Sequence, residues 1–524
     1  MGRRRWAIRA RRVRTLDAAR PDAECLAVEG SRVLAVGSEE EVRGRAGPGI
    51  EWLDLRPAVI TPGLSDAHIH LLEWCLSRSI PDLSGAASKS EVLRAVTAGV
   101  QAAPPGAWVE LRGWDPELTR GAGLDELDEA GRGRAVGLIA HDLHSCWVNS
   151  EAMRRLEITP GRPDPAGGRL ERDAGGRPTG ILREQALSFW YGGRPAPGRS
   201  ERRAALLEGQ STLHALGVTA VHSVEGPDSF AVVQELERSE ELRLRVLQHM
   251  PHGHLDAVIA CGMASGFGSE WLRIGGIKMF TDGALGSRTA WMLEPYEDTG
   301  GFGIRRLEPA AFRADVDRAA RAGLASTVHA IGDAAVRMTL DALESASGHG
   351  VALPHRIEHL QCVAPGDVGR VGRAGIIASM QPSHLLTDIP AVDRAWGPRR
   401  GRGAFAFRSL LDAGTVLAFG SDAPVEAPDP REGFYAALVR RARDGRPPEG
   451  WFPEERLSGP EILEAYTLGP ARAAGDAGRR GRLAPGLTAD LVAWDVDLVD
   501  AEPDQISAAG VVATVIGGEL VHGG

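Results

Sequence analysis

Residues 61–70, Thr-Pro-Gly-Leu-Ser-Asp-Ala-His-Ile-His, place two histidines two positions apart. On a β-strand, alternate side chains point to the same side, so His68 and His70 would direct both imidazoles at one point. Imidazole nitrogens bind divalent ions such as Zn2+ at about 2.0–2.1 Å, which makes this pair a candidate metal site. Two ordinary surface histidines are the alternative, and for an isolated pair of this spacing they are the commoner case.

A lysine, Lys278, stands at the end of the apolar run 273–280, where a charged side chain is unexpected. A lysine at the rim of a barrel usually extends its ammonium group into water. A buried lysine, in contrast, is readily shifted toward its neutral form. The neutral amine can capture CO2 as a carbamate, and a carbamate can bridge two cations.

Two more histidines and an aspartate follow later runs of the same kind. His329 and His359 each stand at the end of a short β-rich run, and Asp422 follows the run 415–420. In a barrel enzyme the C-terminal ends of the strands form the catalytic face. A carboxylate at that face can bind a metal ion and accept a proton from metal-bound water. Each residue alone is a weak signal, but six candidate ligands in chain order, each at a strand end, predict one metal centre.

The middle of the chain alternates between short β-rich runs and helical stretches such as 309–322 and 334–345. The expected strands are residues 217–222, 243–249, 273–280, 325–329, 356–358, 375–380 and 415–420. Such alternation favours parallel βα units, and an eight-unit barrel is their commonest closed arrangement. We therefore predict an α/β fold with a (β/α)8 TIM-like barrel over residues 63–474. Residues from about 78 to 205 exceed one βα unit, and we predict that they form an inserted subdomain covering one end of the barrel.

Both ends of the chain consist of short β-rich runs separated by Gly or Pro. These runs are residues 6–13, 25–29, 32–37, 51–55, 490–494, 511–516 and 519–522. We expect residues 1–62 and 475–524 to form one small β-sandwich. Arginines 3–5, 9, 11, 12 and 14 alternate with apolar residues, which favours a solvated edge strand over a phosphate-binding arm.

The composition narrows the class of protein. The 524 residues carry a net charge of −10 with a pI of about 5.9, whereas a nucleic-acid binder usually has a basic excess. Five scattered cysteines without a CxxC pair favour a reducing compartment over a disulfide framework. No secretory signal and no apolar run of membrane-spanning length is apparent. We expect a cytoplasmic protein with a small-molecule substrate, no nucleic-acid or membrane partner, and a homo-oligomeric state, a dimer.

The ordered set of candidate ligands resembles the amidohydrolase superfamily. Within it, the chain is similar to the amidohydrolase-3 (YtcJ-like) branch, which includes N-substituted formamide deformylases. The resemblance runs nearly end to end. The stretches that carry it are Gly113-Trp114-Asp115, residues 144–150 (His-Ser-Cys-Trp-Val-Asn-Ser), residues 282–290 (Asp-Gly-Ala-Leu-Gly-Ser-Arg-Thr-Ala), Gln381-Pro382 and residues 483–491 (Leu-Ala-Pro-Gly-Leu-Thr-Ala-Asp-Leu).

The resemblance implies two divalent metal ions, for which zinc is expected because nitrogen and carboxylate ligands suit it. It implies that His68, His70 and Asp422 hold the more buried ion. It likewise implies that His329 and His359 hold the more exposed one. A carboxylated Lys278 would bridge the two ions; without the carbamate, the site could be mononuclear.

Four further residues are candidates for substrate binding. His144 and Asn149 lie in the inserted segment, where they could reach the substrate or brace a loop. Arg288 could pair with a substrate carboxylate or anchor its own loop. Trp114 could line an apolar pocket, although tryptophans are usually packing residues.

The resemblance, together with the six candidate ligands, implies a metal-dependent amidohydrolase that cleaves a C–N bond, in an amide or an N-formyl or N-acyl amine, by metal-activated hydroxide. Asp422 would move the proton from the hydroxide to the leaving amine. A cyclic-amide hydrolase or a heterocycle deaminase on the same site is one alternative. A non-catalytic, dihydropyrimidinase-related assembly protein and a phosphotriesterase-like esterase are the others. The complete ligand set argues against the assembly protein, and the terminal β-rich segments argue weakly against the esterase.

Overall fold

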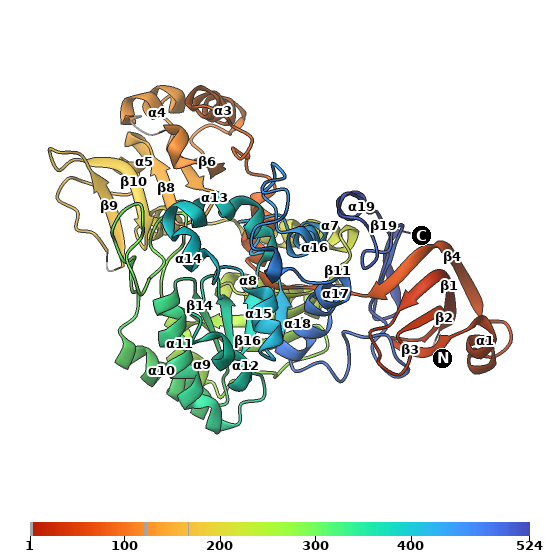
Figure 1. The fold of residues 1–524 in the computed structure, drawn as a ribbon. Coiled ribbons are helices and arrows are strands. Elements are labelled where there is room, and N and C mark those ends of the chain that lie inside the picture. Colours follow the sequence, from red (N-terminus) through yellow and green to blue (C-terminus); the bar gives the residue numbers. More distant parts are fainter. Residues whose placement is uncertain (1–3, 120–122, 166, 524) are drawn as a thin grey trace.

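Eight parallel strands form the centre of the computed structural model, which describes residues 4–119, 123–165 and 167–523 (Figure 1). Their order in the sheet is β17-β16-β15-β14-β13-β12-β11-β5. The strands are β5 (Leu64–Ile69), β11 (Val218–Ser223), β12 (Arg245–Pro251), β13 (Leu272–Phe280), β14 (Ser326–Ala330), β15 (Arg356–His359), β16 (Ile377–Met380) and β17 (Leu417–Phe419). Backbone hydrogen bonds from Asp422 to His68 and from His70 to Ala423 join the end of the last strand to the first. The predicted barrel is thus confirmed.

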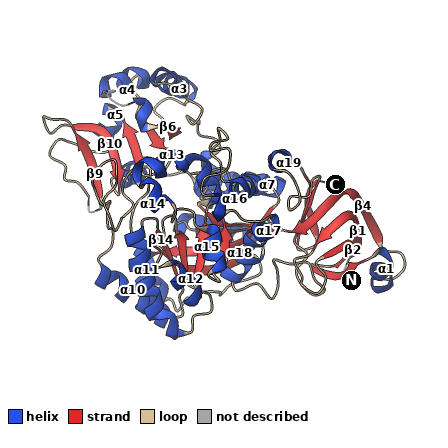
Figure 2. Ribbon diagram, viewed as in Figure 1, coloured by secondary structure: helices blue, strands red, loops and turns tan. Residues whose placement is uncertain are grey.

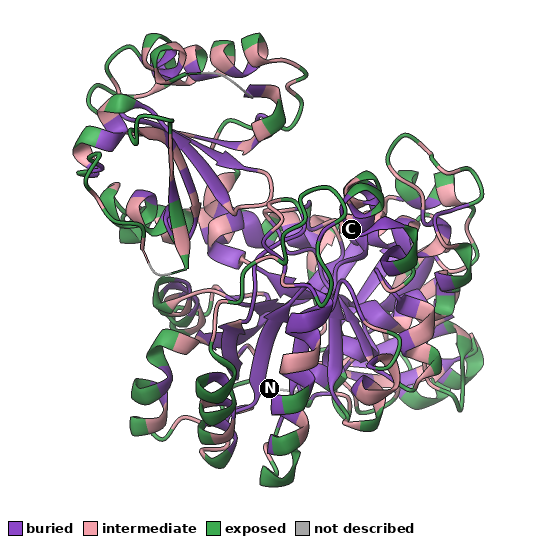
Figure 3. Cartoon of the chain, turned by 60° about the vertical axis from the view of Figure 1, so that its left-hand side comes forward, coloured by how far each residue is buried: buried purple, intermediate pink, exposed green. Residues whose placement is uncertain are grey.

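Helices cover the outside of the barrel, and the strands between them are buried on both faces (Figure 3). These helices are α2 (Leu71–Ser77), α7 (Arg199–Ala215), α8 (Pro227–Arg238), α9 (Leu255–Ala260), α10 (Pro309–Arg321), α11 (Asp333–Ala346), α12 (Val368–Arg373), α13 (Leu385–Ala395), α14 (Gly397–Gly401), α15 (Phe407–Asp412), α16 (Pro430–Val439), α17 (Gly459–Tyr466) and α18 (Leu468–Ala473). In α10, Phe312, Val316, Ala319 and Ala320 are buried, which is the apolar stripe expected of a helix on a barrel. Among the described residues, no helix is both long and apolar enough to span a bilayer.

Strands from both ends of the chain lie in one seven-stranded sheet beside the barrel (Figure 2). Its order is β20-β19-β18-β4-β1-β2-β3, and α19 (Pro503–Ala508) lies between β18 and β19 in the chain. The strands are β1 (Arg5–Arg14), β2 (Asp22–Glu29), β3 (Arg32–Gly37), β4 (Glu51–Pro62), β18 (Leu491–Trp494), β19 (Val511–Ile516) and β20 (Glu519–Gly523). One face of the sheet forms a shared apolar core, and α1 (Glu39–Ala46) packs against the other. A buried ion pair between Arg245 and Asp490, 2.7 Å, fixes this sheet to the barrel.

The prediction that the basic N-terminal segment is an edge strand is wrong. Strand β1 lies inside the sheet, antiparallel to β2 and parallel to β4. Its arginines meet carboxylates: Arg9 pairs with Glu39 at 2.8 Å and Arg14 with Asp497 at 2.7 Å. Alternation of basic and apolar residues marks a strand with one polar face, but it does not reveal whether that strand has one neighbour or two. Arg3 lies outside the described residues.

The segment between α2 and α7 carries a sheet of its own, in the order β6-β7-β8-β10-β9. Its strands are β6 (Val109–Trp114), β7 (Val136–Ala140), β8 (Ser145–Val148), β9 (Gly168–Arg172) and β10 (Pro178–Glu184). Its helices are α3 (Lys89–Ala102), α4 (Leu124–Gly131), α5 (Ser150–Arg155) and α6 (Leu187–Gly193). Helix α7 packs against α2 and α8, so the chain has returned to the barrel by Arg199. Figure 1 shows this insertion, coloured orange to yellow, above the barrel.

Candidate active site

The six predicted ligands line one cavity of about 280 Å³ at the C-terminal ends of the barrel strands. Nitrogen and carboxylate atoms of His68, His70 and Asp422 lie within 4.8 Å of one another. The Nε2 atoms of His68 and His70 are 3.3 and 3.4 Å from Asp422 Oδ1. The ring of His359 lies 4.9 Å from that of His68 and 4.6 Å from that of His329. The structure therefore brings the six residues together from five strands.

Two of these residues have left-handed backbone conformations: φ is 69° at His359 and 60° at Asp422. Such conformations cost a non-glycine residue about 1–3 kcal/mol, and they cluster at functional sites, where surrounding contacts enforce them. Asp422 is held by a backbone hydrogen bond of 2.7 Å from its N–H to the carbonyl oxygen of His68. The strain directs both side chains toward the cavity, in agreement with a site built for a ligand.

Three polar atoms at this cavity are buried without a hydrogen-bond partner among the described residues: His68 Nε2, Lys278 Nζ and Asp422 Oδ1. A buried polar atom left unpaired costs about 1–3 kcal/mol and calls for an explanation such as an ion. Nitrogen and carboxylate donors of this kind are those that Zn2+ takes. The residues present therefore fit a divalent metal ion.

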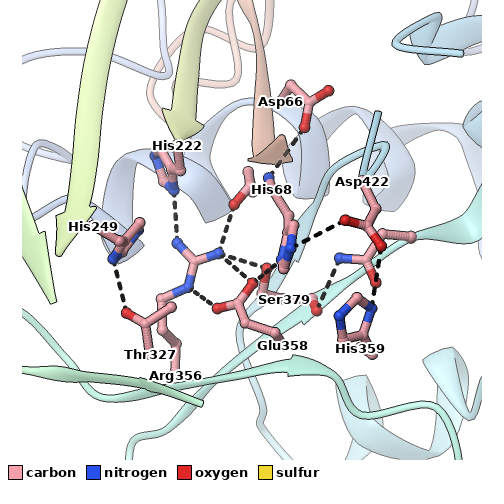
Figure 4. Close-up of polar contacts among 12 residues, drawn as sticks. Asp66, His68, His222, His249, Thr327, Arg356, Glu358, His359, Ser379 and Asp422 are labelled. Carbon is pink, nitrogen blue, oxygen red and sulfur yellow. Dashed lines mark hydrogen bonds and ion pairs between the residues drawn. The ribbon is translucent and has the colours of Figure 1, made fainter. Parts of the chain in front are cut away.

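His68 is fixed from below by a charged network (Figure 4). Its Nδ1 pairs with Glu358, and Arg356 donates to both carboxylate oxygens of Glu358. Burial alone would raise the pKa of Glu358, but Arg356 and His68 hold it well below its usual range. Because Glu358 occupies Nδ1 of His68, Nε2 is the nitrogen that faces the cavity. Metal-binding histidines are commonly oriented by a carboxylate partner in this way. This network gives Glu358 the task of orienting His68.

Arg356 also fills the barrel interior beneath the cavity. Its guanidinium donates to Ala67 O and Ser379 Oγ, both at 2.6 Å, and lies 2.7 Å from His222 Nδ1. His222 is fully buried and does not line the cavity. Burial and the charge of Arg356 hold the pKa of His222 well below its usual value, so it is a neutral packing and hydrogen-bonding group.

Lys278 is buried on β13, with its Nζ 4.8 Å from the centre of the Phe280 ring. Burial, the largest effect, lowers the pKa of Lys278 to about 8, against the opposing charges of Glu358 and Asp422. An amine in this range is partly neutral near pH 7–8, which the capture of CO2 requires. The local environment is therefore compatible with the predicted carbamate.

Asp282 organises the neighbourhood of His329, a role that sequence reasoning did not assign. Its carboxylate accepts hydrogen bonds from the backbone N–H groups of Trp291, Ile331 and Gly332, and lies 3.5 Å from His329 Nε2. Burial raises the pKa of Asp282 to about 7. The nearby Asp333 instead accepts a hydrogen bond from the backbone N–H of Leu293. The sequence feature that could have identified Asp282 is its position, only four residues after the candidate ligand Lys278.

The four candidate substrate-binding residues separate into two groups. His144 lines the cavity, with its ring 6.4 Å from that of His329. The other three do not line it. Asn149 caps α5 by accepting from Ala152 N at 3.0 Å, and Arg288 pairs with Asp298 at 2.8 Å. Trp114 is buried in the insertion and stacks on Trp147 at 5.8 Å.

The upper wall of the cavity comes largely from groups that the sequence did not indicate. Among the polar side chains that line the cavity are Asp142, Glu184, Arg306, His384 and Asp388. Burial raises the pKa of Asp388 to about 6, against the effect of its hydrogen bond from Gln361 at 2.6 Å. These side chains come from the insertion and from the segments that follow the barrel strands, including α13, so no strand periodicity marked them.

Comparisons with known proteins agree with this geometry. The Amidohydro_3 model, described as an amidohydrolase family, matches residues 51–522. The chain is 32% identical to Protein LONG AFTER FAR-RED 3 of Arabidopsis thaliana, over 97% of this chain and 90% of that protein. It is 29% identical to the putative amidohydrolase YtcJ of Bacillus subtilis (strain 168), over 95% and 96% of the two chains. It is also 29% identical to N-substituted formamide deformylase of Arthrobacter pascens, over 97% and 96%.

A solved structure gives the same result for the fold. An uncharacterized metal-dependent hydrolase from Pyrococcus horikoshii OT3 matches with a TM-score of 0.79 and 26% sequence identity, over 95% of this chain and 99% of that one. The resemblance predicted from the sequence motifs is thereby confirmed, as is the fold class.

Proposed function

We propose that this chain, which belongs to the Amidohydro_3 family of amidohydrolases, is a metal-dependent hydrolase that cleaves the C–N bond of an amide. The observation that carries the proposal is a set of three buried atoms that have no hydrogen-bond partner among the described residues, His68 Nε2, Lys278 Nζ and Asp422 Oδ1, at one strand-end cavity. In a protein without a bound ion, such a set would only destabilise the fold. We take N-formyl and N-acyl amines as the substrate class.

In this proposal the ligands divide between two ions. His68, His70 and Asp422 would hold one ion, and His329 and His359 would hold the other. The neutral amine of Lys278 would attack CO2: its lone pair forms the N–C bond, one C–O π pair becomes the carboxylate charge, and the amine proton leaves to solvent. Carboxylated Lys278 would then help to hold both ions. When bound, the ions would supply the Lewis acidity that acidifies a water molecule and polarises a carbonyl group.

Asp422 is the proton carrier in this proposal. Burial alone would raise its pKa, but His68, His70 and His359 hold it well below the usual range, so the carboxylate is ionised at neutral pH. An ionised Asp422 can accept the proton that the attacking water loses and can deliver it to the leaving nitrogen. The C–O bond forms first, as the carbonyl π pair moves onto oxygen. The C–N bond then breaks as that pair returns and the nitrogen takes the proton, and the products are a carboxylic acid and an amine. Glu358 is unsuited to this task because Arg356 and His68 occupy both of its oxygens.

The formamide class has specific support. The relative from Arthrobacter pascens carries the name N-substituted formamide deformylase, and the similarity spans almost the whole of both chains. The cavity of about 280 Å³ is also small and has a polar wall, which suits a compact polar group beside the ligands. Cyclic amides and amino-substituted heterocycles use the same attacking water, so they are the comparison substrates. We also propose that the chain acts as a homodimer, which light scattering would test.

The test is a substrate panel assayed with zinc-loaded protein. Formate or amine release should be detected from N-substituted formamides or N-acyl amines, and it should disappear in Asp422→Asn. Preferential ring opening of cyclic amides, or ammonia release from heterocycles, would show that the proposed substrate class is wrong. The proposed metal site would still stand. A metal-loaded protein without turnover on any C–N substrate would contradict the proposal and favour a non-catalytic role.

A further inference from the structure

We propose that His144, positioned by Glu184, is a catalytic residue of this site. Its Nε2 donates a hydrogen bond to the carbonyl oxygen of the scissile amide, where negative charge develops during attack. This inference rests on the proposed amide hydrolysis and adds the group that stabilises the oxyanion. It also gives the inserted segment a direct part in the reaction.

The position of His144 is the first observation. It ends the loop between β7 and β8, and this loop extends from the insertion to the barrel mouth. Asp142, Leu143 and His144 all line the cavity of the predicted ligands. The centre of the His144 ring is 6.4 Å from that of the His329 ring, so one substrate group can lie near both.

The orientation of the imidazole is the second observation. His144 Nδ1 lies 2.9 Å from Glu184 Oε2, so this nitrogen carries the proton shared with the carboxylate. The remaining nitrogen, Nε2, has no partner among the described residues. Loop bracing alone would need only the Nδ1 contact. A ring that also lines the cavity with its other nitrogen free is arranged to meet a ligand.

Glu184 is built to hold this ring, and it joins the insertion to the barrel. Its second oxygen, Oε1, accepts from Thr289 Oγ1 at 2.6 Å, in the loop after β13. Its backbone N–H donates to His144 O at 2.9 Å, and its φ of 53° is left-handed. Gly283 makes the close approach possible, because a Cβ there would lie 2.8 Å from Glu184 Oε1 and 2.1 Å from Thr289 Oγ1. Strained backbone and a closely packed glycine at one contact indicate that the position of Glu184 is tightly specified.

Charge supports the donor role. Burial would lower the pKa of His144, but Glu184 outweighs it and raises the pKa to about 9, so the ring is an imidazolium at neutral pH. Asp422, the proposed proton carrier, contacts His68, His70 and His359, whereas His144 lies beside His329. An amide between them would direct its carbonyl oxygen toward the cation and its nitrogen toward the carboxylate. The reverse orientation would place a developing oxyanion against Asp422.

The test compares zinc-loaded wild type with His144→Ala, Glu184→Gln and the control His141→Ala. His141 belongs to the same loop, is 43% exposed and does not line the cavity. The first readout is hydrolysis of 4-nitroformanilide and 4-methoxyformanilide, which share a carbonyl group and differ in leaving group. Removing one oxyanion donor typically costs about 10²–10³-fold in kcat. We expect that loss in His144→Ala, equal for both substrates and with little change in KM.

The second readout does not depend on turnover. Methylphosphonate resembles the tetrahedral, negatively charged centre, and its binding to the zinc-loaded protein can be measured by calorimetry. His144→Ala should weaken this binding about 10- to 100-fold, the value of one charge-assisted hydrogen bond, whereas His141→Ala should not. Glu184→Gln should shift the alkaline limb of the pH–kcat profile to lower pH, because the imidazolium loses the carboxylate that stabilises it.

The outcomes separate the two proposals. Normal kcat and normal methylphosphonate binding in His144→Ala would overturn the role of His144 and leave the hydrolase intact. If His144→Ala loses more kcat on 4-methoxyformanilide than on 4-nitroformanilide, His144 does not act on the carbonyl oxygen. That result would mean that His144 protonates the leaving nitrogen. If wild type binds methylphosphonate through His144 but cleaves neither formanilide, His144 is confirmed as a hydrogen-bond donor to a tetrahedral anion. The proposed substrate class is then wrong. Absence of both binding and cleavage would contradict both proposals.

Discussion

The barrel and the insertion meet at the same cavity but contribute to it by different means. The barrel supplies the predicted ligands from the ends of buried strands, with Glu358 and Arg356 fixing His68 from beneath. The insertion supplies residues 142–144 of a loop, and Glu184 holds the His144 side chain of this loop at the mouth. A packed barrel gives precise positions, and loops supported by a scaffold are where binding properties vary. We infer that metal affinity resides in the barrel and that substrate recognition resides in the insertion.

The largest effect is expected at Lys278, on the barrel side of this comparison. Lys278→Ala should lose metal and activity together, because the variant lacks the amine that forms the bridging carbamate. Acetate or formate should restore part of the activity by supplying a carboxylate in the vacated space. High-resolution density at the tip of Lys278 in the metal-loaded protein is the complementary measurement. A bare amine beside two bound ions would show that the carbamate is absent.

The next effect separates proton transfer from metal binding. Asp422→Asn keeps the shape and one oxygen but cannot accept a proton, so kcat should fall by about 10²–10⁴-fold while most of the metal remains. The acidic limb of the pH–rate profile should change as well. This limb belongs jointly to the carboxylate and the activated water, so neither pKa is assigned to a single group. Near-normal turnover with metal bound would mean that another group is the base.

A smaller effect is expected beneath the site. Glu358→Gln keeps the volume but weakens the contact that orients His68, and loss of such a partner typically costs about 10–100-fold in metal affinity. Competition with a chromophoric chelator would measure the change. Glu344→Gln, in the outer helix α11, is the matched control, since the Glu344 side chain pairs, within the described part of the chain, with Arg370 alone. Equal metal affinity in Glu358→Gln and wild type would show that Glu358 does not contribute to metal binding through His68.

The smallest effect is expected in the insertion, away from the cavity. Asn149→Ala removes the cap of α5, so the free energy of unfolding should fall by about 0.5–2 kcal/mol. Metal content and KM should not change, because Asn149 does not line the cavity. Denaturant titration and steady-state kinetics measure the two quantities. A raised KM with an unchanged free energy of unfolding would contradict this prediction and would show that Asn149 takes part in substrate binding.

Sequence patterns predicted the strand ends well because a barrel strand is short, apolar and buried on both faces. His329 and His359 were found in this way, each within the last two residues of its strand. The partners of these residues were not predictable, because periodicity indicates the face of an element but not what lies opposite. Glu358 is 290 residues from His68 in the sequence, and Glu184 is 40 from His144. The same limitation explains β1, whose second neighbour in the sheet is β4.

The central claim is that the barrel mouth holds two divalent ions, and metal analysis tests it most directly. Protein purified without chelator should contain about two equivalents of divalent metal per chain by inductively coupled plasma mass spectrometry, with zinc predominant. The paired variant His68→Ala/His329→Ala, which removes a ligand of each proposed ion, should contain far less when prepared identically. Wild-type protein without stoichiometric metal, or equal metal content in wild type and the paired variant, would contradict the account.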